Sequence, residues 1–194
     1  MKIIYIIGKS SSGKDTVFNI LKEKLDVNTY VMYTTRPKRS GEIDGITYNF
    51  LSDDQMKNLV EEKKNNKVIE YRTYNTIYGP WTYATIEDNQ FKSKKDILML
   101  GTLESYIKIK EYFNKKSIVI PIYLEVPDNI RLYRALKREE QQEHPRYDEM
   151  CRRFLSDCTD FSEEKLQEAG ITKRFQDIDG NKCAEEISEY IKQF

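Results

Sequence analysis

The feature with the clearest chemistry is a glycine-rich loop near the start of the chain. Gly8 and Gly13 lie five residues apart, and Lys14 follows at once. Glycines let backbone N–H groups converge on phosphate oxygens, and the lysine reaches the outer phosphates. An apolar run, 3–7, precedes the loop and an amphipathic stretch follows it, so the order of elements is strand, loop and helix. The pattern predicts a phosphate-binding loop; the alternative is a glycine turn capped by serines.

The residue after this lysine departs from the usual pattern. The pattern has Ser or Thr there, whose hydroxyl binds Mg²⁺, but here Asp15 takes the place and Thr16 comes one step later. A carboxylate close to a triphosphate is repelled unless it contacts the metal ion or turns away to interact with its own helix dipole. We expect Asp15 and Thr16 to contribute to a metal site, and the helix-dipole role remains open.

A second cluster of cations follows a predicted strand. Arg36, Lys38 and Arg39 lie within four residues. One arginine can bind a phosphate through two parallel N–H···O bonds, and two arginines can hold a dianion from different sides. Taken alone, the cluster is also compatible with a solvated basic loop or a localisation signal.

Composition limits what the chain can be. Its 194 residues suffice for one domain with small insertions. Charged residues make up 33% and balance, 32 basic against 32 acidic, which argues against binding nucleic acid or an anionic membrane by bulk attraction. The apolar runs are too short to span a bilayer, and the first residues lack the features of a signal peptide.

The cysteines and the single histidine exclude several chemistries. Cys151, Cys158 and Cys183 are odd in number and form no C-x-x-C pair, so we expect free thiols in a reducing compartment and a cytoplasmic protein. With only His144 in the chain, a histidine triad or a multi-histidine metal site is excluded. The chemistry must therefore depend on lysine, arginine, carboxylates and a bound ion.

The apolar periodicities predict alternating strands and helices. Helices are expected over about 14–25, 53–64, 103–113, 127–138, 147–169 and at the C-terminus; strands are expected over 29–35, 47–51, 68–71, 96–101, 117–125 and near 175. A turn is expected at 65–66, and a break at 78–81 followed by a short helix. Strands that alternate with helices imply a parallel sheet covered on both faces.

One long motif resembles a known family. Residues 34–50 read T-T-R-P-K-R-S-G-E-I-D-G-I-T-Y-N-F. They match every fixed position of T-T-R-x-x-R-x-G-E-x-x-G-x-x-Y-x-F, the acceptor-binding segment of guanylate kinases. Glu70 and Tyr78 with Gly79 fall where that family keeps a glutamate and a Tyr-Gly pair, and residues 126–138 resemble the start of its arginine-bearing lid. The resemblance covers residues 3–155 well and the last forty loosely.

The resemblance implies the fold and its division into parts. The fold class would be α/β, a P-loop NTPase three-layer sandwich with a parallel core sheet, a small β-rich acceptor-binding insertion and a helical lid. We expect one guanylate-kinase-like domain over 1–194. Its core would comprise 1–33, 81–130 and 155–194, its acceptor-binding region 34–80, and its lid 131–154.

The resemblance also implies residue roles. The residues implied to bind ATP are Gly8, Ser10, Ser11, Ser12, Gly13, Lys14, Asp15 and Thr16. The residues implied to hold the acceptor are Arg36, Arg39, Tyr48, Glu70 and Tyr78, with Glu70 accepting from purine N–H groups. Lys14, Arg134, Arg138 and Arg153 would neutralise charge on the transferring phosphoryl group, because this chemistry needs positioning and charge neutralisation rather than a nucleophile. Arg146 or Arg152 could take the place of Arg153. The implied cofactors are ATP and Mg²⁺, and the implied partners are small-molecule nucleotides.

Two departures leave a second function open. Pro80 replaces a family Ser or Thr whose hydroxyl reads the base, and residues 98–102 lack the family's Asp-x-Asp pair. The first hypothesis is therefore an ATP-dependent kinase for a nucleoside monophosphate, with GMP converted to GDP, or for a different monophosphate. The second is a catalytically weakened module that binds a phosphorylated or acidic partner in the acceptor groove.

Overall fold

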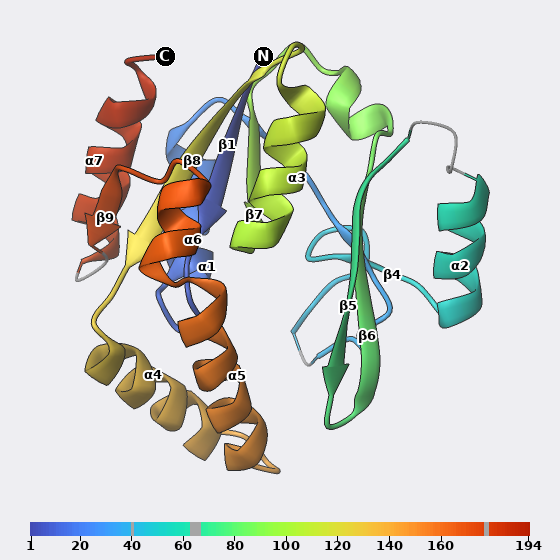
Figure 1. The fold of residues 1–194 in the computed structure, drawn as a ribbon, viewed down its shortest axis with the longest axis vertical. Coiled ribbons are helices and arrows are strands. Elements are labelled where there is room, and N and C mark those ends of the chain that lie inside the picture. Colours follow the sequence, from blue (N-terminus) through green and yellow to red (C-terminus); the bar gives the residue numbers. More distant parts are fainter. Residues whose placement is uncertain (40, 63–66, 177–178) are drawn as a thin grey trace. The chain divides into compact units, whose positions relative to one another are not determined.

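The computed structural model describes residues 1–39, 41–62, 67–176 and 179–194, which form two compact units. The first unit contains residues 1–28 and 95–194, and the second contains residues 29–94. Figure 1 shows the elements of both units, coloured along the chain.

A five-stranded sheet forms the centre of the first unit. Its strands, in spatial order, are β2 (Asn28–Thr29), β7 (Ile97–Gly101), β1 (Lys2–Ile7), β8 (Ile118–Glu125) and β9 (Arg174–Gln176). β1 pairs in parallel with β7 and β8, and β8 pairs in parallel with β9. The predicted parallel sheet is therefore confirmed, with β1, the strand before the glycine-rich loop, in the middle.

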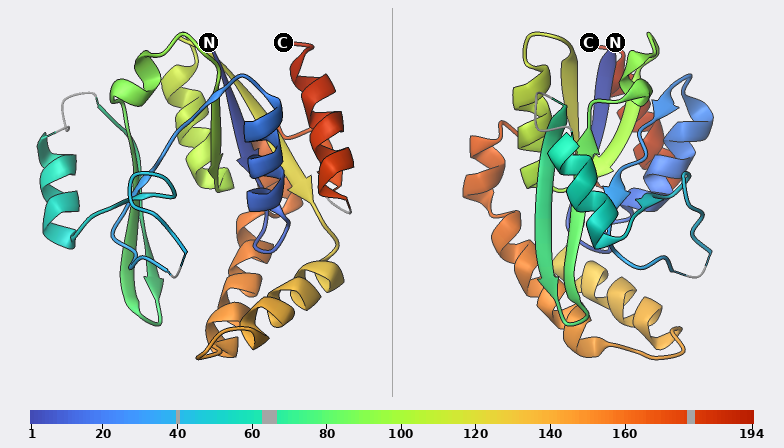
Figure 2. Two further views of the ribbon diagram at one scale, coloured as in Figure 1. Left: turned by 180° about the vertical axis from the view of Figure 1, so that it is seen from behind. Right: turned by 90° about the vertical axis from the view of Figure 1, so that its right-hand side faces the viewer.

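Helices cover both faces of this sheet (Figures 1 and 2). The helices of this unit are α1 (Lys14–Lys24), α3 (Leu103–Phe113), α4 (Asp128–Glu140), α5 (Tyr147–Asp160), α6 (Glu163–Glu168) and α7 (Gly180–Ile191). Of these, α4 and α5 extend beyond the carboxyl end of β8 instead of covering a face of the sheet (Figure 1). Side chains alternate along β1 because successive residues of a strand point to opposite faces. Ile4 and Ile6 pack in one core with residues of α1 and α7. Tyr5 faces the other way, toward Tyr106 of α3.

The second unit contains a smaller sheet. Its strands, in order, are β4 (Asn49–Phe50), β3 (Tyr33–Thr34), β6 (Gly79–Ile86) and β5 (Val68–Thr76), and its helices are α2 (Asp53–Glu62) and the 3₁₀ helix η1 (Asn89–Lys92). β6 pairs antiparallel with both β3 and β5. Met56 of α2 packs on Ala84 and Ile86 of β6 in a small core of its own.

Three sequence predictions differ from the structure. The break expected at 78–81 is a hairpin turn, which Gly79 closes with φ +102°, but the short helix expected after it is wrong, because β6 begins at Gly79. The single helix over 147–169 is also wrong, because Phe161 leaves the helical conformation and Ser162 caps the separate helix α6. The strand expected over 29–35 is instead two short strands, β2 and β3. The end of the helix near 64, the turn at 65–66 and Ser40 lie outside the described residues.

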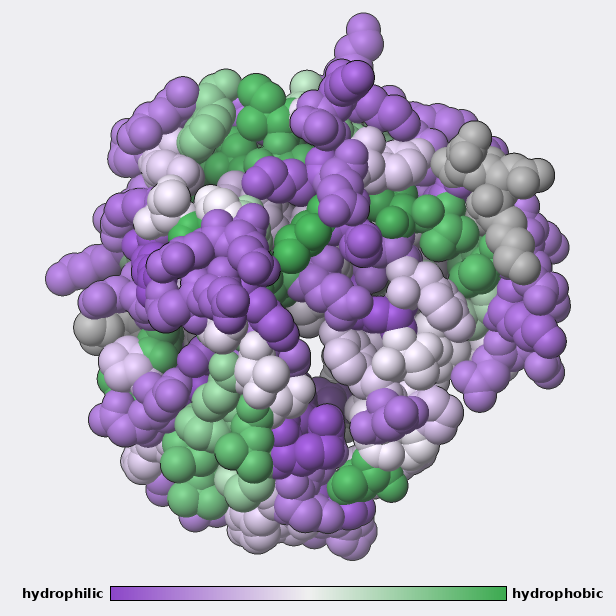
Figure 3. Space-filling view, in the orientation of Figure 1, coloured by the Kyte–Doolittle hydropathy of each residue, from purple (hydrophilic) through white to green (hydrophobic). Residues whose placement is uncertain are grey.

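The surface agrees with the charged composition. On the face drawn in Figure 3, hydrophilic residues prevail and hydrophobic residues lie in separate groups. Among the described residues, every helix is too short or too polar to cross a membrane.

Candidate active site

The loop from residue 8 to residue 14, called the phosphate loop below, joins β1 to α1 in the first unit. Gly13 and Ser11 both have left-handed backbones, with φ +86° and +61°. For a serine this conformation costs about 1–3 kcal/mol and marks functional sites. A Cβ on Gly8 would lie 2.8 Å from the carbonyl oxygen of Leu124 in β8. Glycine is therefore required at position 8 for close packing and is favoured at position 13 for the turn.

Two serine hydroxyls of the phosphate loop have no partner in the fold. Ser11 Oγ and Ser12 Oγ are buried and make no hydrogen bond with the described residues. An unpaired buried polar atom costs about 1–3 kcal/mol, so native structures contain few of them. A ligand rich in acceptor oxygens would satisfy both hydroxyls. The loop therefore fits a bound polyphosphate.

The phosphate loop is held in place by helices α4 and α5. The Ser10 N–H donates to Asp157 Oδ2 at 2.7 Å, and Arg131 Nη1 donates to the Ser10 carbonyl at 3.1 Å. Arg131 is only 1% exposed and also donates to Asp128 Oδ1. Both backbone groups of Ser10 are thus fixed by charged side chains, so the two helices position the loop.

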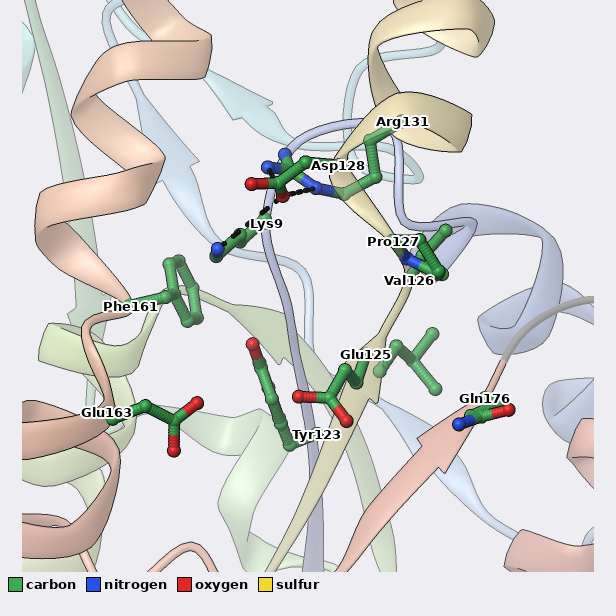
Figure 4. A pocket seen from close by; sticks show the side chains of 11 residues that line it. Lys9, Tyr123, Glu125, Val126, Pro127, Asp128, Arg131, Phe161, Glu163 and Gln176 are labelled. Carbon is green, nitrogen blue, oxygen red and sulfur yellow. Dashed lines mark hydrogen bonds and ion pairs between the residues drawn. The ribbon is translucent and has the colours of Figure 1, made fainter.

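A pocket of about 310 Å³ lies at the end of β8, beside Arg131 and Asp128 (Figure 4). Lys9, Asp128 and Arg131 lie together on one side of it, and Lys9 Nζ is 3.6 Å from Asp128 Oδ1. Tyr123 and Phe161 stack on the other side, with ring centroids 5.9 Å apart. Lys9 and Arg131 are therefore both paired with Asp128, and these pairs hold the start of the phosphate loop in place.

Lys14 folds back over its own loop. Its Nζ donates to the carbonyl oxygens of Gly8 and Lys9 at 2.7 and 2.8 Å. Burial lowers the pKa of Lys14 from 10.5 to about 8. The ammonium group is thus held by neutral carbonyls, which an anionic ligand can replace with a stronger charge-assisted bond.

Charged groups from α1, α4 and α5 surround this lysine. After burial, the charges that act on the pKa of Lys14 are those of Asp15 and Asp157, which raise it, and Arg153 and Arg131, which lower it. Desolvation and then the Arg153 guanidinium lower the pKa of Arg138, and Asp15 opposes them. Lys14 and Arg138 thus share two charged neighbours, Asp15 and Arg153.

The other arginines considered for this role are placed differently. Arg152 forms a two-pronged pair with Glu149, with both bonds at 2.8 Å, and Arg146 pairs with Asp148 of its own helix. Arg134 is half-buried on α4, and Arg131 rather than Arg134 is the α4 arginine whose charge acts most on Lys14. Arg153 is thus better placed than Arg146 or Arg152 to complete the site.

Asp15 and Thr16 lie exposed in the first turn of α1. Among the described residues, no three His, Cys, Asp or Glu side chains are grouped to hold a metal ion. Mg²⁺ is commonly bound by one or two carboxylates together with substrate phosphates. Asp15 and Thr16 therefore fit an ion that arrives with a nucleotide rather than a resident metal.

The cationic loop of the second unit is organised by Glu42. Arg36 Nη2 donates to Glu42 Oε1 at 2.6 Å, and the Arg39 N–H donates to Glu42 Oε2 at 2.7 Å. Arg36 is buried, which lowers its pKa, but the bond to Glu42 together with the charges of Glu42 and the neighbouring tyrosines outweighs burial, and the pKa of Arg36 is raised. Burial would raise the pKa of Glu42, but the bonds from Arg36 and Arg39 lower it. The pair is preorganised, with Arg36 permanently charged.

Aromatic rings surround the buried arginine. The Arg36 guanidinium lies 5.3 Å from the centre of the Tyr48 ring and 5.6 Å from that of Phe50. Tyr48 in turn makes an edge contact with Tyr83 of β6. Tyr78 is 53% exposed and stacks on Trp81 near the hairpin turn, with ring centroids 5.7 Å apart. The structure thus gathers Arg36, Arg39 and Tyr48, and places Tyr78 in a separate contact.

Glu70 is buried on β5 and paired with a residue that the sequence analysis did not select. Arg72 Nη1 and Thr85 Oγ1 both donate to Glu70 Oε1. Arg72 Nε also donates to Tyr74 Oη at 2.9 Å. The predicted base-reading carboxylate therefore belongs to a buried ion pair.

Comparisons with known proteins agree with this geometry. The guanylate kinase family model matches residues 1–167 of the chain. The chain belongs to the guanylate kinase family. A guanylate kinase of Rickettsia prowazekii is 32% identical over 143 residues, which cover 71% of this chain and 70% of that protein. A guanylate kinase of Bacteroides fragilis is 27% identical over 67% of this chain, which spans 63% of that relative's length, less than two thirds.

A solved structure has a similar fold. The guanylate kinase of Anaplasma phagocytophilum superposes with a TM-score of 0.64 at 20% identity, covering 99% of this chain and 85% of that chain. At this identity the likeness concerns the fold. It agrees with the predicted P-loop NTPase class and the parallel core sheet.

One departure from the guanylate kinase pattern has a structural cause. At the end of β7, where the family has Asp-x-Asp, a Cβ on Gly101 would lie 2.2 Å from Tyr5 Oη and 2.6 Å from Ser105 Oγ. The Tyr5 hydroxyl donates to Ser105 Oγ at 2.7 Å in the same space. No side chain therefore fits at position 101 while Tyr5 holds this place.

Sequence reasoning missed two residues, Asp157 and Arg72, and the organising role of Glu42. Asp157 is 147 positions from its partner Ser10, so no local pattern connects them. Arg72 had a usable signal, because a strand that places Glu70 and Arg72 two residues apart puts them on one face.

Proposed function

We propose that this protein transfers the γ-phosphoryl group of ATP to a nucleoside monophosphate, converting GMP to GDP. The observation that carries the proposal is the phosphate loop. Its two buried hydroxyls, Ser11 Oγ and Ser12 Oγ, have no partner among the described residues, and its backbone is held in a left-handed conformation at Ser11. Membership of the guanylate kinase family supports the same substrate pair.

The charges around Lys14 support a role in transfer. In our proposal, Lys14 leaves the carbonyls of Gly8 and Lys9 and donates to the outer phosphates of ATP. Arg138 and Arg153, with Arg134 from the same helix as Arg138, neutralise charge that develops on the transferring group. Phosphoryl transfer depends on such positioning and charge neutralisation rather than on a covalent intermediate.

Asp15 and Thr16 would hold Mg²⁺ when the nucleotide is bound. The chemistry that the ion would supply is positive charge, which would offset the charge of the triphosphate and its repulsion of Asp15. Arg131 and Asp157 would act before any ligand binds, because they fix the Ser10 backbone and so maintain the conformation of the phosphate loop.

The second unit would bind the acceptor. Arg36 and Arg39, both bonded to Glu42, would grip the monophosphate together with the hydroxyls of Tyr48 and Tyr78. Glu70 would accept from an N–H group of the base. The matched motif over residues 34–50 supports this assignment, because it contains Arg36, Arg39 and Tyr48 at the family's positions.

The alternative is a module that binds a phosphorylated or acidic partner and has lost catalysis. The missing Asp-x-Asp pair favours it, since both carboxylates are absent at the end of β7. The phosphate loop argues against it, because a module that never binds ATP has no use for two unpaired buried hydroxyls and a lysine held over the loop.

A coupled ADP-release assay with GMP, IMP, AMP, CMP, UMP and dTMP tests the proposal. We expect turnover with GMP and with at least one other monophosphate within about a hundredfold in kcat/KM, because Pro80 supplies no donor to the base. Two results would contradict the proposal: ADP release at the same rate without any monophosphate, or no ADP release with any of the six monophosphates. Exclusive use of GMP would contradict only the expected tolerance.

A further inference from the structure

The carboxylate of Glu70 is asymmetric in its hydrogen bonds. Oε1 accepts from Arg72 Nη1 and from Thr85 Oγ1, the latter at 3.1 Å. Within the described residues, Oε2 accepts no hydrogen bond. A carboxylate oxygen has two acceptor sites, so Oε1 is fully occupied and Oε2 carries the remaining capacity.

The side chain that occupies Oε1 is firmly held. Arg72 is 8% exposed, its Nε donates to Tyr74 Oη at 2.9 Å, and its guanidinium lies 5.5 Å from the centre of the Tyr83 ring. Glu70 itself is 5% exposed. Separating a buried pair of this kind leaves uncompensated charge, so a ligand does not easily displace Arg72 from Glu70.

Thr85 is fixed in the same way by the sheet. It pairs directly with Glu70 across the β5–β6 ladder, and its side chain is fully buried. A bulge between Val68 and Glu70 sets the register at this point. Both donors to Oε1 are therefore part of the folded framework rather than mobile groups at a site edge.

We propose that Arg72 is a specificity-determining residue that limits Glu70 to one base N–H group. By occupying Oε1 together with Thr85, it leaves a single oxygen, Oε2, for the base. Guanine offers two adjacent donors, N1–H and the 2-amino group, whereas hypoxanthine offers N1–H alone. The site then reads N1–H and is indifferent to the 2-amino group, so its substrate class is the 6-oxopurine monophosphates rather than GMP alone. This inference rests on the proposed function, in which Glu70 faces the base.

The test compares GMP with IMP, which differ only in the 2-amino group, by equilibrium titration and by kcat/KM. In the wild type we expect affinities within about threefold of each other. Thr85→Val removes one donor to Oε1 without changing any charge, and should raise the preference for GMP to about tenfold. Arg72→Met removes the other donor to Oε1 and should raise the preference for GMP over IMP further.

Thr82→Val is the matched control. Thr82 lies on the same strand and bonds Thr73 Oγ1 at 2.9 Å instead of Glu70. A merely structural role for Arg72 and Thr85 would weaken GMP and IMP binding equally in all variants and leave the ratio unchanged. Because Arg72→Met leaves a buried charge unpaired and can fail to fold, Thr85→Val carries the test in that case.

Two outcomes separate this inference from the proposed function. A wild-type preference for GMP over IMP well above tenfold, unmoved by Thr85→Val, overturns the inference while turnover of GMP upholds the function. If the wild type neither binds nor phosphorylates either nucleotide, the proposed function fails and the inference fails with it.

Discussion

The phosphate loop of the first unit and the buried arginines of the second unit treat positive charge in opposite ways. In the first unit, the Lys14 ammonium is bonded, among the residues that the structure describes, only to backbone carbonyls, and burial lowers its pKa to about 8. In the second unit, buried Arg36 and Arg72 each have a carboxylate partner, and the pKa of Arg36 is raised.

Under the proposed function, this difference gives two kinds of phosphate site. Within the described residues, the Lys14 ammonium has no carboxylate partner, so a strongly anionic ligand gains the most there. In the second unit, Arg36 and Arg72 are already paired with carboxylates, so selectivity would come from the geometry of groups that are fixed before the ligand binds.

Lys14→Ala should reduce phosphoryl transfer by about a hundredfold or more. Within the described part of the chain, the side chain bonds only to carbonyls of its own loop, so the fold should be unaffected. Turnover is measured by ADP release, with circular dichroism and a thermal melt as controls. Turnover near the wild-type rate, or loss of secondary structure, would show that Lys14 has another role.

Arg36→Ala and Arg39→Ala should each raise the KM for GMP by about ten- to a hundredfold while ATP affinity stays unchanged, because a bond to a charged group is worth about 1.5–3 kcal/mol. Arg36→Ala should be the more severe, since it also leaves Glu42 without its partner. Lys38→Ala, at an exposed lysine of the same loop, is the matched control. Weakened ATP binding in either arginine variant would contradict two separate phosphate sites.

The affinity for ATP should fall as pH rises above about 8, by about tenfold per unit, because free Lys14 then loses its proton. The affinity for GMP should stay constant over the same range, because Arg36 remains charged. Titrations of each ligand between pH 7 and 9, where guanine keeps the N1 proton that Glu70 accepts, measure the two profiles, and Lys14→Arg should flatten the ATP profile. In the unfolded chain Lys14 keeps its proton up to its ordinary pKa of 10.5. Between pH 8 and 10.5 the unfolded state therefore binds more protons than the folded state, so Lys14 raises the free energy of unfolding as pH rises through this range. Equal pH profiles for ATP and GMP would remove the contrast.

Asp15→Ser should have the smallest effect. If Asp15 contacts Mg²⁺, the variant should change the Mg²⁺ concentration needed for half-maximal rate. If it only interacts with the dipole of α1, the variant should lower the free energy of unfolding by about 0.3–1 kcal/mol with unchanged Mg²⁺ dependence. Rates at varied Mg²⁺ and a denaturant titration distinguish the two roles.

The sequence predicted the parts of the site that are contiguous in the chain. Gly8, Gly13 and Lys14 could be recognised because a strand, a tight loop and a helix leave strong local patterns. The helix break at Phe161 was missed because apolar spacing continues through it, although Ser162 is a typical helix cap. Likewise, Gly79 and Pro80 indicated a break, and the hairpin became apparent only from the pairing of β5 with β6.

The long-range contacts of the site could not be predicted. Arg131 and Asp157 converge on Ser10 from two helices, and their sequence separations from it are 121 and 147. The ion pair of Glu70 and Arg72 is local, yet the effect of Thr85 on the same oxygen depends on strand register. Such contacts follow from how the sheets assemble rather than from any spacing in the chain.

The central claim is transfer from a triphosphate on the phosphate loop to a monophosphate acceptor. It is tested most directly by following the phosphorus atoms of ATP and GMP together by ³¹P NMR in one reaction with Mg²⁺. The account predicts that ADP and GDP appear in equal amounts, with no inorganic phosphate. Inorganic phosphate in place of GDP, or unchanged spectra of both nucleotides, would contradict it.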